Sequence, residues 1–273
     1  MLFLLQKTPE KILKKFFVVT IDITTRRVYN IVVIKKVTTN RFTFSIFKII
    51  QNKNFSTQFS GGTVMKIAVV CANGKAGQLI TKEAVNRGFD VTAFVRGENK
   101  SAAKNAVTKD LFDITKEDLN GCDVVVDACG GWTAETIPVI PKAGEHLCNL
   151  LAGTDTRLVI VGGAGTLYVN PEHTIRVADG KDFPDAFKPL AAAHQVLLDG
   201  LRKRNDVKWT YVSPAGDFQA DGERTGEYTL GGEELVLNSK GESVISYADY
   251  AIAFVDEIAN GNHIGERISV VSK

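Results

Sequence analysis

The order of apolar and polar residues after Met65 alternates between two patterns. Short apolar runs bounded by turn residues predict strands, and longer stretches with apolar residues at helical spacing predict helices. Strands are expected at residues 67–71, 91–95, 106–108, 123–128, 158–161, 209–213 and 267–271, and helices at about 76–87, 137–151, 186–204 and 246–259. Runs that are apolar on both faces and separated by helices predict a covered parallel sheet. The expected fold class is therefore α/β, a Rossmann-type doubly wound parallel sheet.

The pattern becomes looser after Gly162. Residues 162–185 are rich in Gly, Pro, Asn and Asp and predict a long loop over the strand ends. Residues 227–237 have strand character interrupted by Gly231 and Gly232, which predicts a hairpin. The segments 162–185 and 214–250 are expected to form a small C-terminal substrate-binding part of the domain 65–273.

Residues 1–64 differ from the rest of the chain. They hold 11 Lys and Arg against 2 Asp and Glu, near +9, whereas residues 65–273 hold 22 against 29, near −7. Three origins are compatible with this segment: a basic, acid-poor targeting peptide, a small basic domain, or upstream sequence joined by a wrong start choice. We favour the third, because Met65 directly precedes the first strand and Gly61-Gly62 fits an in-frame ribosome-binding sequence. The segment 1–64 is thus expected to lie outside the native fold.

The composition excludes several classes of function. The acidic balance of residues 65–273 argues against nucleic-acid binding. No stretch of about 18 apolar residues exists, so no membrane span is expected. The four histidines lack metal-ligand spacing, so no metal site is expected. The cysteines, which form no C-x-x-C pair, are expected to be reduced core residues of a cytoplasmic protein, a monomer or homodimer. They are Cys71, Cys122, Cys129 and Cys148.

A glycine-containing turn lies between the first strand and the first helix of residues 65–273. Strand, small-residue turn and helix is the arrangement that presents backbone N–H groups to a phosphate. Gly74 would let the backbone approach a pyrophosphate, and Gly77 would let the helix pack close to the sheet. Cys71 stands where the usual pattern has its first glycine. The expected pyrophosphate site comprises Cys71, Asn73, Gly74, Lys75, Ala76 and Gly77.

Arg96 follows the second strand, where an NAD-specific site usually has an acidic residue for the ribose hydroxyls. An arginine can instead pair with a 2′-phosphate, and Lys75 adds positive charge. The expected cofactor is therefore NADPH, with NADH possible.

Eight segments in order resemble one protein family. They are Val-Val-Cys-Ala-Asn-Gly-Lys-Ala-Gly (69–77), Ala-Phe-Val-Arg (93–96), Phe-Asp-Ile-Thr (112–115), Asp-Val-Val-Val-Asp-Ala-Cys-Gly (123–130), Val-Gly-Gly-Ala-Gly (161–165), Trp-Thr-Tyr-Val-Ser-Pro-Ala (209–215), Gly-Glu-Tyr (226–228) and Ile-Ser-Tyr-Ala-Asp-Tyr-Ala (245–251). Together they resemble the atypical short-chain dehydrogenase/reductases. The likeness is to the NAD(P)H-binding group often named as candidate NADH-flavin reductases, which is similar to biliverdin reductase B and the NmrA-like proteins.

The resemblance covers residues 65–273 and implies further roles. Phe112 and Asp113 would flank the adenine, although Asp113 could equally be a helix cap. Ala128, Cys129 and Gly130 would line the nicotinamide-side ribose. Ser213 and Pro214 would border the nicotinamide, although Pro214 could simply end a strand. Gly162 and Gly163 would also contact the cofactor, and the stretch from Gly162 to Thr166 would lie where this superfamily has substrate-side polar groups.

The chemistry that remains points to a conjugated acceptor. None of the six tyrosines has a lysine four residues on, so the Tyr-x-x-x-Lys pair of ordinary short-chain dehydrogenases is absent. Hydride transfer to a flavin or quinone needs less acid assistance than ketone reduction. We expect an NAD(P)H-dependent oxidoreductase with such an acceptor, and Thr166, Lys188 and His194 as candidate catalytic groups. Two alternatives stay open: a non-catalytic NADP(H) sensor of the NmrA-like type, and an epimerase-like enzyme.

Overall fold

The computed structural model describes residues 13–22, 27–36, 48–49 and 64–273 of the chain. The chain divides into two compact units, residues 1–57 and 58–273. In the first unit β1 (Leu13–Asp22) pairs antiparallel with β2 (Arg27–Lys36), which in turn pairs with β3 (Lys48–Ile49). These strands include the apolar runs of that segment. The proposal that residues 1–64 lie outside the native fold stays untested.

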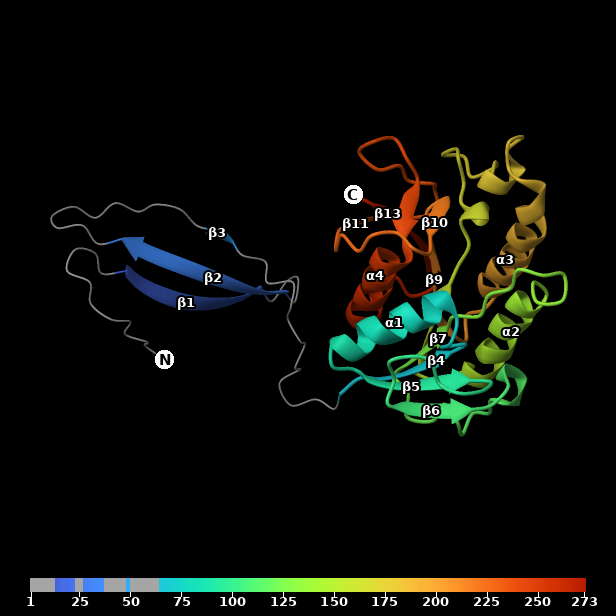
Figure 1. Ribbon diagram of the computed structural model, residues 1–273, viewed down its shortest axis with the longest axis horizontal. Helices are drawn as coiled ribbons and strands as arrows, with labels where there is room; N and C mark the ends of the chain where they lie inside the picture. The colour runs from blue at the N-terminus through green and yellow to red at the C-terminus, as the bar shows by residue number, and fades with distance from the viewer. Residues whose placement is uncertain (1–12, 23–26, 37–47, 50–63) are drawn as a thin grey trace. The chain divides into compact units, whose positions relative to one another are not determined.

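The second unit is built on an eight-stranded sheet, which Figure 1 shows with its helices. The strand order is β11-β13-β9-β8-β7-β4-β5-β6, and every pair is parallel except β11 with β13. The strands are β4 (Lys66–Val70), β5 (Asp90–Val95), β6 (Asn105–Thr108), β7 (Val124–Asp127), β8 (Arg157–Val161), β9 (Lys208–Ser213), β11 (Tyr228–Gly231) and β13 (Glu266–Ser272). The predicted doubly wound parallel sheet is confirmed.

Two pairs of helices cover the two faces of this sheet. One face carries α1 (Lys75–Asn86) and α4 (Tyr247–Asn260), whose Ile80, Ala84 and Phe254 pack on the β4 side chains Ile67 and Val69. The other face carries α2 (Val139–Leu151) and α3 (Lys188–Leu201). Alternate residues of each central strand are buried on opposite faces, which explains their apolar sequence.

The helix ends follow from local sequence. Ser246 accepts a hydrogen bond from the backbone N–H of Asp249 and caps α4, and Gly261 ends this helix in the left-handed conformation. Thr115 opens the turn at residues 116–121, and the Asp118 carboxylate caps it by accepting from the Thr115 N–H and hydroxyl.

The expected hairpin at residues 227–237 is wrong. β11 pairs with the C-terminal strand β13, and the chain after Gly232 turns toward Tyr168 instead of back along β11. The backbone N–H of Tyr168 donates to Glu233, and that of Leu235 donates to Tyr168. A second small sheet pairs β10 (Asp217–Gln219) with β12 (Val244–Ser246). Both pairings join segments distant in sequence, so local pattern did not reveal them.

The strand order places a topological switch point between β4 and β7. From β4 the chain continues outward to β5 and β6, and then returns to the opposite side of β4 as β7. In open α/β sheets, ligands bind in the crevice at the carboxyl ends of the strands flanking such a point. This edge follows Val70 of β4 and Asp127 of β7.

Candidate dinucleotide site

The turn after β4 has the shape that its small residues predict. Cys71 has φ of +60°, the left-handed conformation that glycine adopts most easily, and so performs the turn without being glycine. A Cβ on Gly77 would lie 2.7 Å from the carbonyl oxygen of Cys71, which is closer than packing allows. Gly77 thus lets the first turn of α1 approach the end of β4.

The N-terminus of α1 is open to an anion. Gly74 is the N-cap residue and offers no side-chain acceptor, and the first turn contains no acidic residue. The first N–H groups of a helix have no acceptor within the helix, and the helix dipole places partial positive charge there. The backbone of Lys75, Ala76 and Gly77 therefore suits a pyrophosphate.

Asn73 ties this turn to the loop after β5. Its Nδ2 donates to the carbonyl oxygen of Glu98 over 2.8 Å, and its Oδ1 accepts from the N–H of Lys100 over 2.7 Å. Asn73 thus links the phosphate turn to the loop after β5 by two hydrogen bonds. Its side-chain amide is largely committed to these backbone groups.

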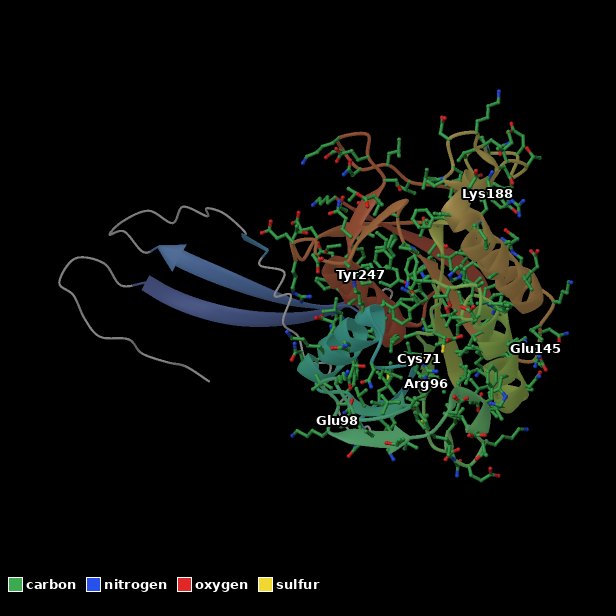
Figure 2. The ribbon with its side chains drawn as sticks, turned by 45° about the vertical axis from the view of Figure 1, so that its right-hand side comes forward. Cys71, Arg96, Glu98, Glu145, Lys188 and Tyr247 are labelled. Atoms are coloured by element: carbon green, nitrogen blue, oxygen red, sulfur yellow. The ribbon has the colours of Figure 1, made fainter. Side chains whose placement is uncertain are left out.

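Arg96 is the first residue after β5 and is exposed. Within the part of the chain that the structure describes, its guanidinium forms no ion pair, so it is available for a ligand. Figure 2 shows Arg96 and Cys71 at neighbouring strand ends. Since β4 and β5 are adjacent and parallel, the sheet itself brings the phosphate turn and this cation to one edge.

Phe112 and Asp113 lie in a single turn at residues 111–113, beyond β6. Asp110, not Asp113, caps that turn by accepting from the N–H of Phe112. Asp113 therefore does not cap this turn, which was the alternative role considered for it from the sequence. The half-exposed Phe112 ring meets His146 edge-on at 5.8 Å.

Ala128, Cys129 and Gly130 continue β7 on the far side of the switch point. The N–H of Ala128 donates to the carbonyl of Val70, and the N–H of Cys129 donates to the carboxylate of Asp127 over 3.0 Å. Asp127 is buried, and burial raises its pKa to about 6 despite this hydrogen bond. A buried carboxyl thus lies directly under this part of the site.

Ser213 and Pro214 end β9 at the same edge of the sheet, and both are buried. The Ser213 hydroxyl has no hydrogen-bond partner among the described residues. A buried polar atom without a partner is costly, so an acceptor or donor supplied by a ligand would remove that cost.

Gly162 and Gly163 follow β8 and allow two side chains to come close. A Cβ on Gly162 would lie 2.4 Å from the Tyr211 ring, and one on Gly163 would lie 2.8 Å from Cδ2 of His194. The N–H of Gly163 donates to the Tyr211 hydroxyl over 3.0 Å. These glycines thus serve local packing, whether or not they also contact a cofactor.

His194 lies on the inner side of α3 and is 8% exposed. Its Nδ1 is 3.0 Å from the Tyr211 hydroxyl oxygen. Burial lowers the pKa of His194 to about 4, so the imidazole is neutral at ordinary pH. It can donate a hydrogen bond but carries no charge.

Thr166 is only 2% exposed, and its polar atoms are used within the protein. Its hydroxyl donates to the carbonyl of Gly163, while the buried Arg267 donates to both its hydroxyl and carbonyl oxygens. Arg267 also pairs with Glu233. Thr166 therefore anchors the loop, and we do not retain it as a group that touches an acceptor.

Lys188 begins α3 and is exposed, with its Nζ 2.6 Å from Asp185. Figure 2 shows it well apart from Cys71 and Arg96. The three candidate catalytic residues are thus separated: His194 and Thr166 meet around Gly163, whereas Lys188 lies at the outer end of α3.

Three buried residues with a part in this region were missed from the sequence: Asp127, Tyr211 and Arg267. Asp127 carries a readable signal, because a carboxylate ends an otherwise apolar strand. Tyr211 carries a weaker one in the glycine pair Gly162-Gly163, whose missing side chains leave room for a ring. Arg267 gives none, because its partners are distant in sequence.

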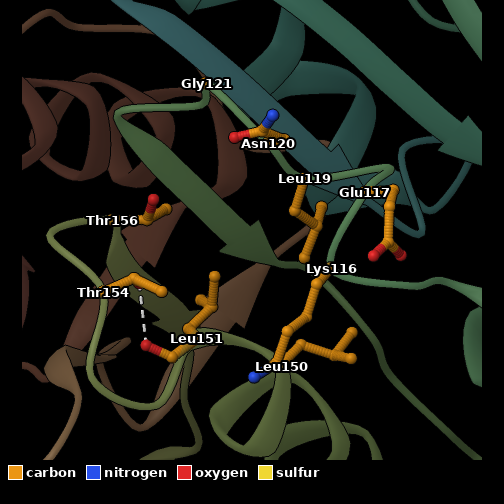
Figure 3. A pocket seen from close by; sticks show the side chains of 9 residues that line it. All are labelled: Lys116, Glu117, Leu119, Asn120, Gly121, Leu150, Leu151, Thr154 and Thr156. Carbon is orange, nitrogen blue, oxygen red and sulfur yellow. Dashed lines mark hydrogen bonds between the residues drawn. The ribbon is translucent and has the colours of Figure 1, made fainter.

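Two surface hollows lie at the opposite edge of the sheet. Figure 3 shows the first, of about 290 Å³, whose lining residues precede β7 and β8: Lys116, Glu117, Leu119, Asn120, Gly121, Leu150, Leu151, Thr154 and Thr156. The second, about 470 Å³, is lined by residues 153–154, 204–209 and 264–265. Neither is near the glycine turn. Because ligands of such sheets bind at the carboxyl ends, we place the site there and not in these hollows.

The described residues contain no cluster of three or more His, Cys, Asp or Glu able to hold a metal ion. Within the described ranges no helix combines the length and apolar character needed to cross a membrane.

Comparison with known proteins identifies the family. Residues 71–260 match the NAD(P)H-binding family, and the chain belongs to it. A solved Streptococcus pneumoniae TIGR4 protein, described as a candidate NADH-flavin reductase, is 55% identical with a TM-score of 0.75, over 77% of this chain and 100% of that one. The uncharacterized YwnB of Bacillus subtilis strain 168 is 41% identical over 212 residues, 77% of this chain and 99% of YwnB. A candidate epimerase of Bacteroides thetaiotaomicron is 33% identical with a TM-score of 0.67, over 77% and 98%. The predicted family is confirmed.

Proposed function

We propose that this member of the NAD(P)H-binding family is an NADPH-dependent reductase that acts on a flavin, quinone or similar conjugated acceptor. The observation that carries the proposal is that two features follow adjacent strands: a helix N-terminus at Gly74 without a side-chain cap, and Arg96, which forms no ion pair with the described residues. The candidate NADH-flavin reductase at 55% identity supports the reaction class.

The residues present fit a bound dinucleotide. Gly77 leaves the space that a Cβ would fill, and the first N–H groups of α1 have no acceptor within the helix. The buried Ser213 hydroxyl has no hydrogen-bond partner among the described residues. Residues 74–77 would hold the pyrophosphate, Arg96 the 2′-phosphate, and Ser213 the nicotinamide side. When bound, NADPH supplies the hydride.

The chain's own residues position the acceptor and shield it from water. We assign His194 the role of a neutral hydrogen-bond donor to an acceptor atom that gains negative charge. The segments 162–185 and 214–250 are proposed to bind the acceptor, since Thr166, Arg267 and Glu233 join them over the strand ends. Lys188 is proposed only as a peripheral charge. We further propose a cytoplasmic location and a monomer or homodimer.

The test is oxidation of NADPH, followed by absorbance, with FMN, FAD and a panel of quinones. Turnover with at least one acceptor supports the proposal. Tight binding of NADPH without turnover of any acceptor would instead favour the non-catalytic sensor. Interconversion of a sugar nucleotide without net oxidation of NADPH would favour the epimerase-like alternative.

A further inference from the structure

The Tyr211 hydroxyl connects a backbone amide to a histidine ring. It accepts from the N–H of Gly163 over 3.0 Å and lies 3.0 Å from Nδ1 of His194. An amide N–H can only donate, so the Tyr211 oxygen is the acceptor of the first bond and its own hydrogen is available to His194. Among the described residues, Nδ1 is the only acceptor with which this hydroxyl forms a hydrogen bond, which favours donation from Tyr211 to Nδ1 and an imidazole proton on Nε2.

The surroundings of His194 strengthen this direction. The ring is neutral, so only one of its two nitrogens carries a proton. Tyr211 is fully buried, and burial raises the pKa of its hydroxyl, so it remains a protonated donor. In this orientation the Gly163 N–H, the Tyr211 O–H and Nδ1 of His194 are all paired, whereas the reverse tautomer would leave the buried Tyr211 hydrogen without an acceptor among the described residues.

The other ring nitrogen is left for a ligand. Among the described residues, Nε2 of His194 has no hydrogen-bond partner. This nitrogen is also not completely buried. Cδ2, the carbon bonded to Nε2, lies beside Gly163 at the carboxyl end of β8. This side of the imidazole is thus at the edge of the sheet that carries the glycine turn.

We propose that Tyr211 is a positioning residue: it holds His194 in the tautomer that presents Nε2–H to the acceptor. The catalytic meaning of this role rests on the proposed reductase function. Nε2–H donates to the acceptor atom where negative charge develops, and no proton leaves the imidazole. A neutral imidazole can act in this way, whereas the opposite tautomer would present a lone pair and repel that charge.

The first test needs no acceptor. Nitrogen-15 NMR of the wild-type protein should show an unprotonated Nδ1 and a protonated Nε2 on His194. A protonated Nδ1 would overturn the proposal. In Tyr211→Phe the His194 signals should move toward a mixture of tautomers, and unchanged signals would likewise contradict it. Tyr250→Phe is the matched control, because its buried hydroxyl donates to the carbonyl of Val212 and does not contact His194.

The second test uses whichever acceptor the wild-type protein reduces. Tyr211→Phe should lower kcat by about tenfold with less than about twofold change in the KM for NADPH, since positioning residues of this kind act on chemistry and not on cofactor binding. Tyr250→Phe should retain kcat. An unchanged kcat in Tyr211→Phe, with the tautomer altered, would refute the positioning role. If the wild-type tautomer is as expected but no acceptor is reduced, the reductase function fails and, with it, the catalytic part of this inference.

Discussion

The Asn73 side-chain amide donates to the carbonyl oxygen of Glu98 over 2.8 Å, and so fixes the distance between the phosphate turn and the loop that begins at Arg96. Asn73→Ala removes this bond and the one from the Lys100 N–H. Two neutral hydrogen bonds contribute roughly 1–3 kcal/mol, so NADPH affinity should fall by about tenfold. Isothermal titration calorimetry measures it. Asn120→Ala, on the opposite edge of the sheet, should bind NADPH normally. An equal loss of NADPH affinity in both variants would contradict the role of Asn73 in linking the two loops.

Arg96 is the residue on which the preference for NADPH depends. Arg96→Ala should weaken NADPH binding by about 10- to 100-fold, because a charge-assisted bond to phosphate contributes roughly 1.5–3 kcal/mol. NADH lacks the 2′-phosphate and should lose less than about threefold on the same scale. The ratio of the two dissociation constants is the measurement. Equal losses for both dinucleotides would refute the assignment of the 2′-phosphate to Arg96.

Substitution of Gly77 tests whether dinucleotide binding and stability depend on the close approach of α1 to β4. A methyl group at this position would lie 2.7 Å from a backbone oxygen, which cannot move without shifting the turn. Gly77→Ala should therefore reduce dinucleotide binding and destabilise the fold by about 1–3 kcal/mol, the usual cost of overpacking. Urea denaturation measures the second effect. Gly200→Ala on α3 is the control, because a Cβ there meets no atom within 4 Å.

Asp127 should give the stability of the protein a characteristic pH dependence. Its pKa is raised from 3.8 to about 6 in the folded state, so folding takes up a proton between these values. The contribution of Asp127 to the free energy of unfolding is fully present below pH 3.8 and is lost as the pH rises through 6. This change in the pKa corresponds to about 3 kcal/mol in the free energy of unfolding. In Asp127→Asn, which cannot titrate at this position, the stability should no longer fall as the pH rises through 6.

His194 changes the stability with pH in the opposite direction to Asp127, so it affects the same experiment. Its folded pKa of about 4 lies below the ordinary 6.5, so its contribution is present above 6.5 and lost as the pH falls through 4. The two slopes partly cancel in the wild type. The measurement is therefore the difference between wild type and Asp127→Asn in urea denaturation at several pH values. Asp155→Asn, at an exposed ion pair, should show no such difference.

A buried ion pair at the opposite edge of the sheet should control stability and not activity. Glu257 pairs with Arg157, and its second oxygen lies 2.6 Å from Nδ1 of His263. Burial alone would raise the pKa of Glu257, but hydrogen bonds from His263 and Arg157 outweigh it and hold that pKa low. Glu257→Gln leaves Arg157 buried without its counter-charge and should cost about 3–5 kcal/mol. Glu266→Gln is the exposed control, and similar unfolding curves for both would contradict the prediction.

The sequence predicted the sheet well because each strand is a local apolar run. It also placed Arg96, Ala128 and Ser213 correctly at strand ends, since parallel strands bring their carboxyl ends to one edge. It could not predict contacts between distant segments. The pairing of Tyr228 with Ser272, and of Arg267 with Thr166, depends on the folded chain and leaves no periodic signal. The same holds for His194: its helix was expected, but its neutral state follows from burial against β9.

Cys71 gives the phosphate turn a chemical reporter. Its left-handed backbone would suit glycine better, yet a half-buried thiol stands there, one residue beyond β4 and within the loop that would surround a pyrophosphate. A dinucleotide bound in this turn is therefore expected to slow alkylation of this sulfur. The rate at which Cys71 is labelled therefore measures occupancy of the turn directly, with no need for turnover, added fluorophores or a known acceptor.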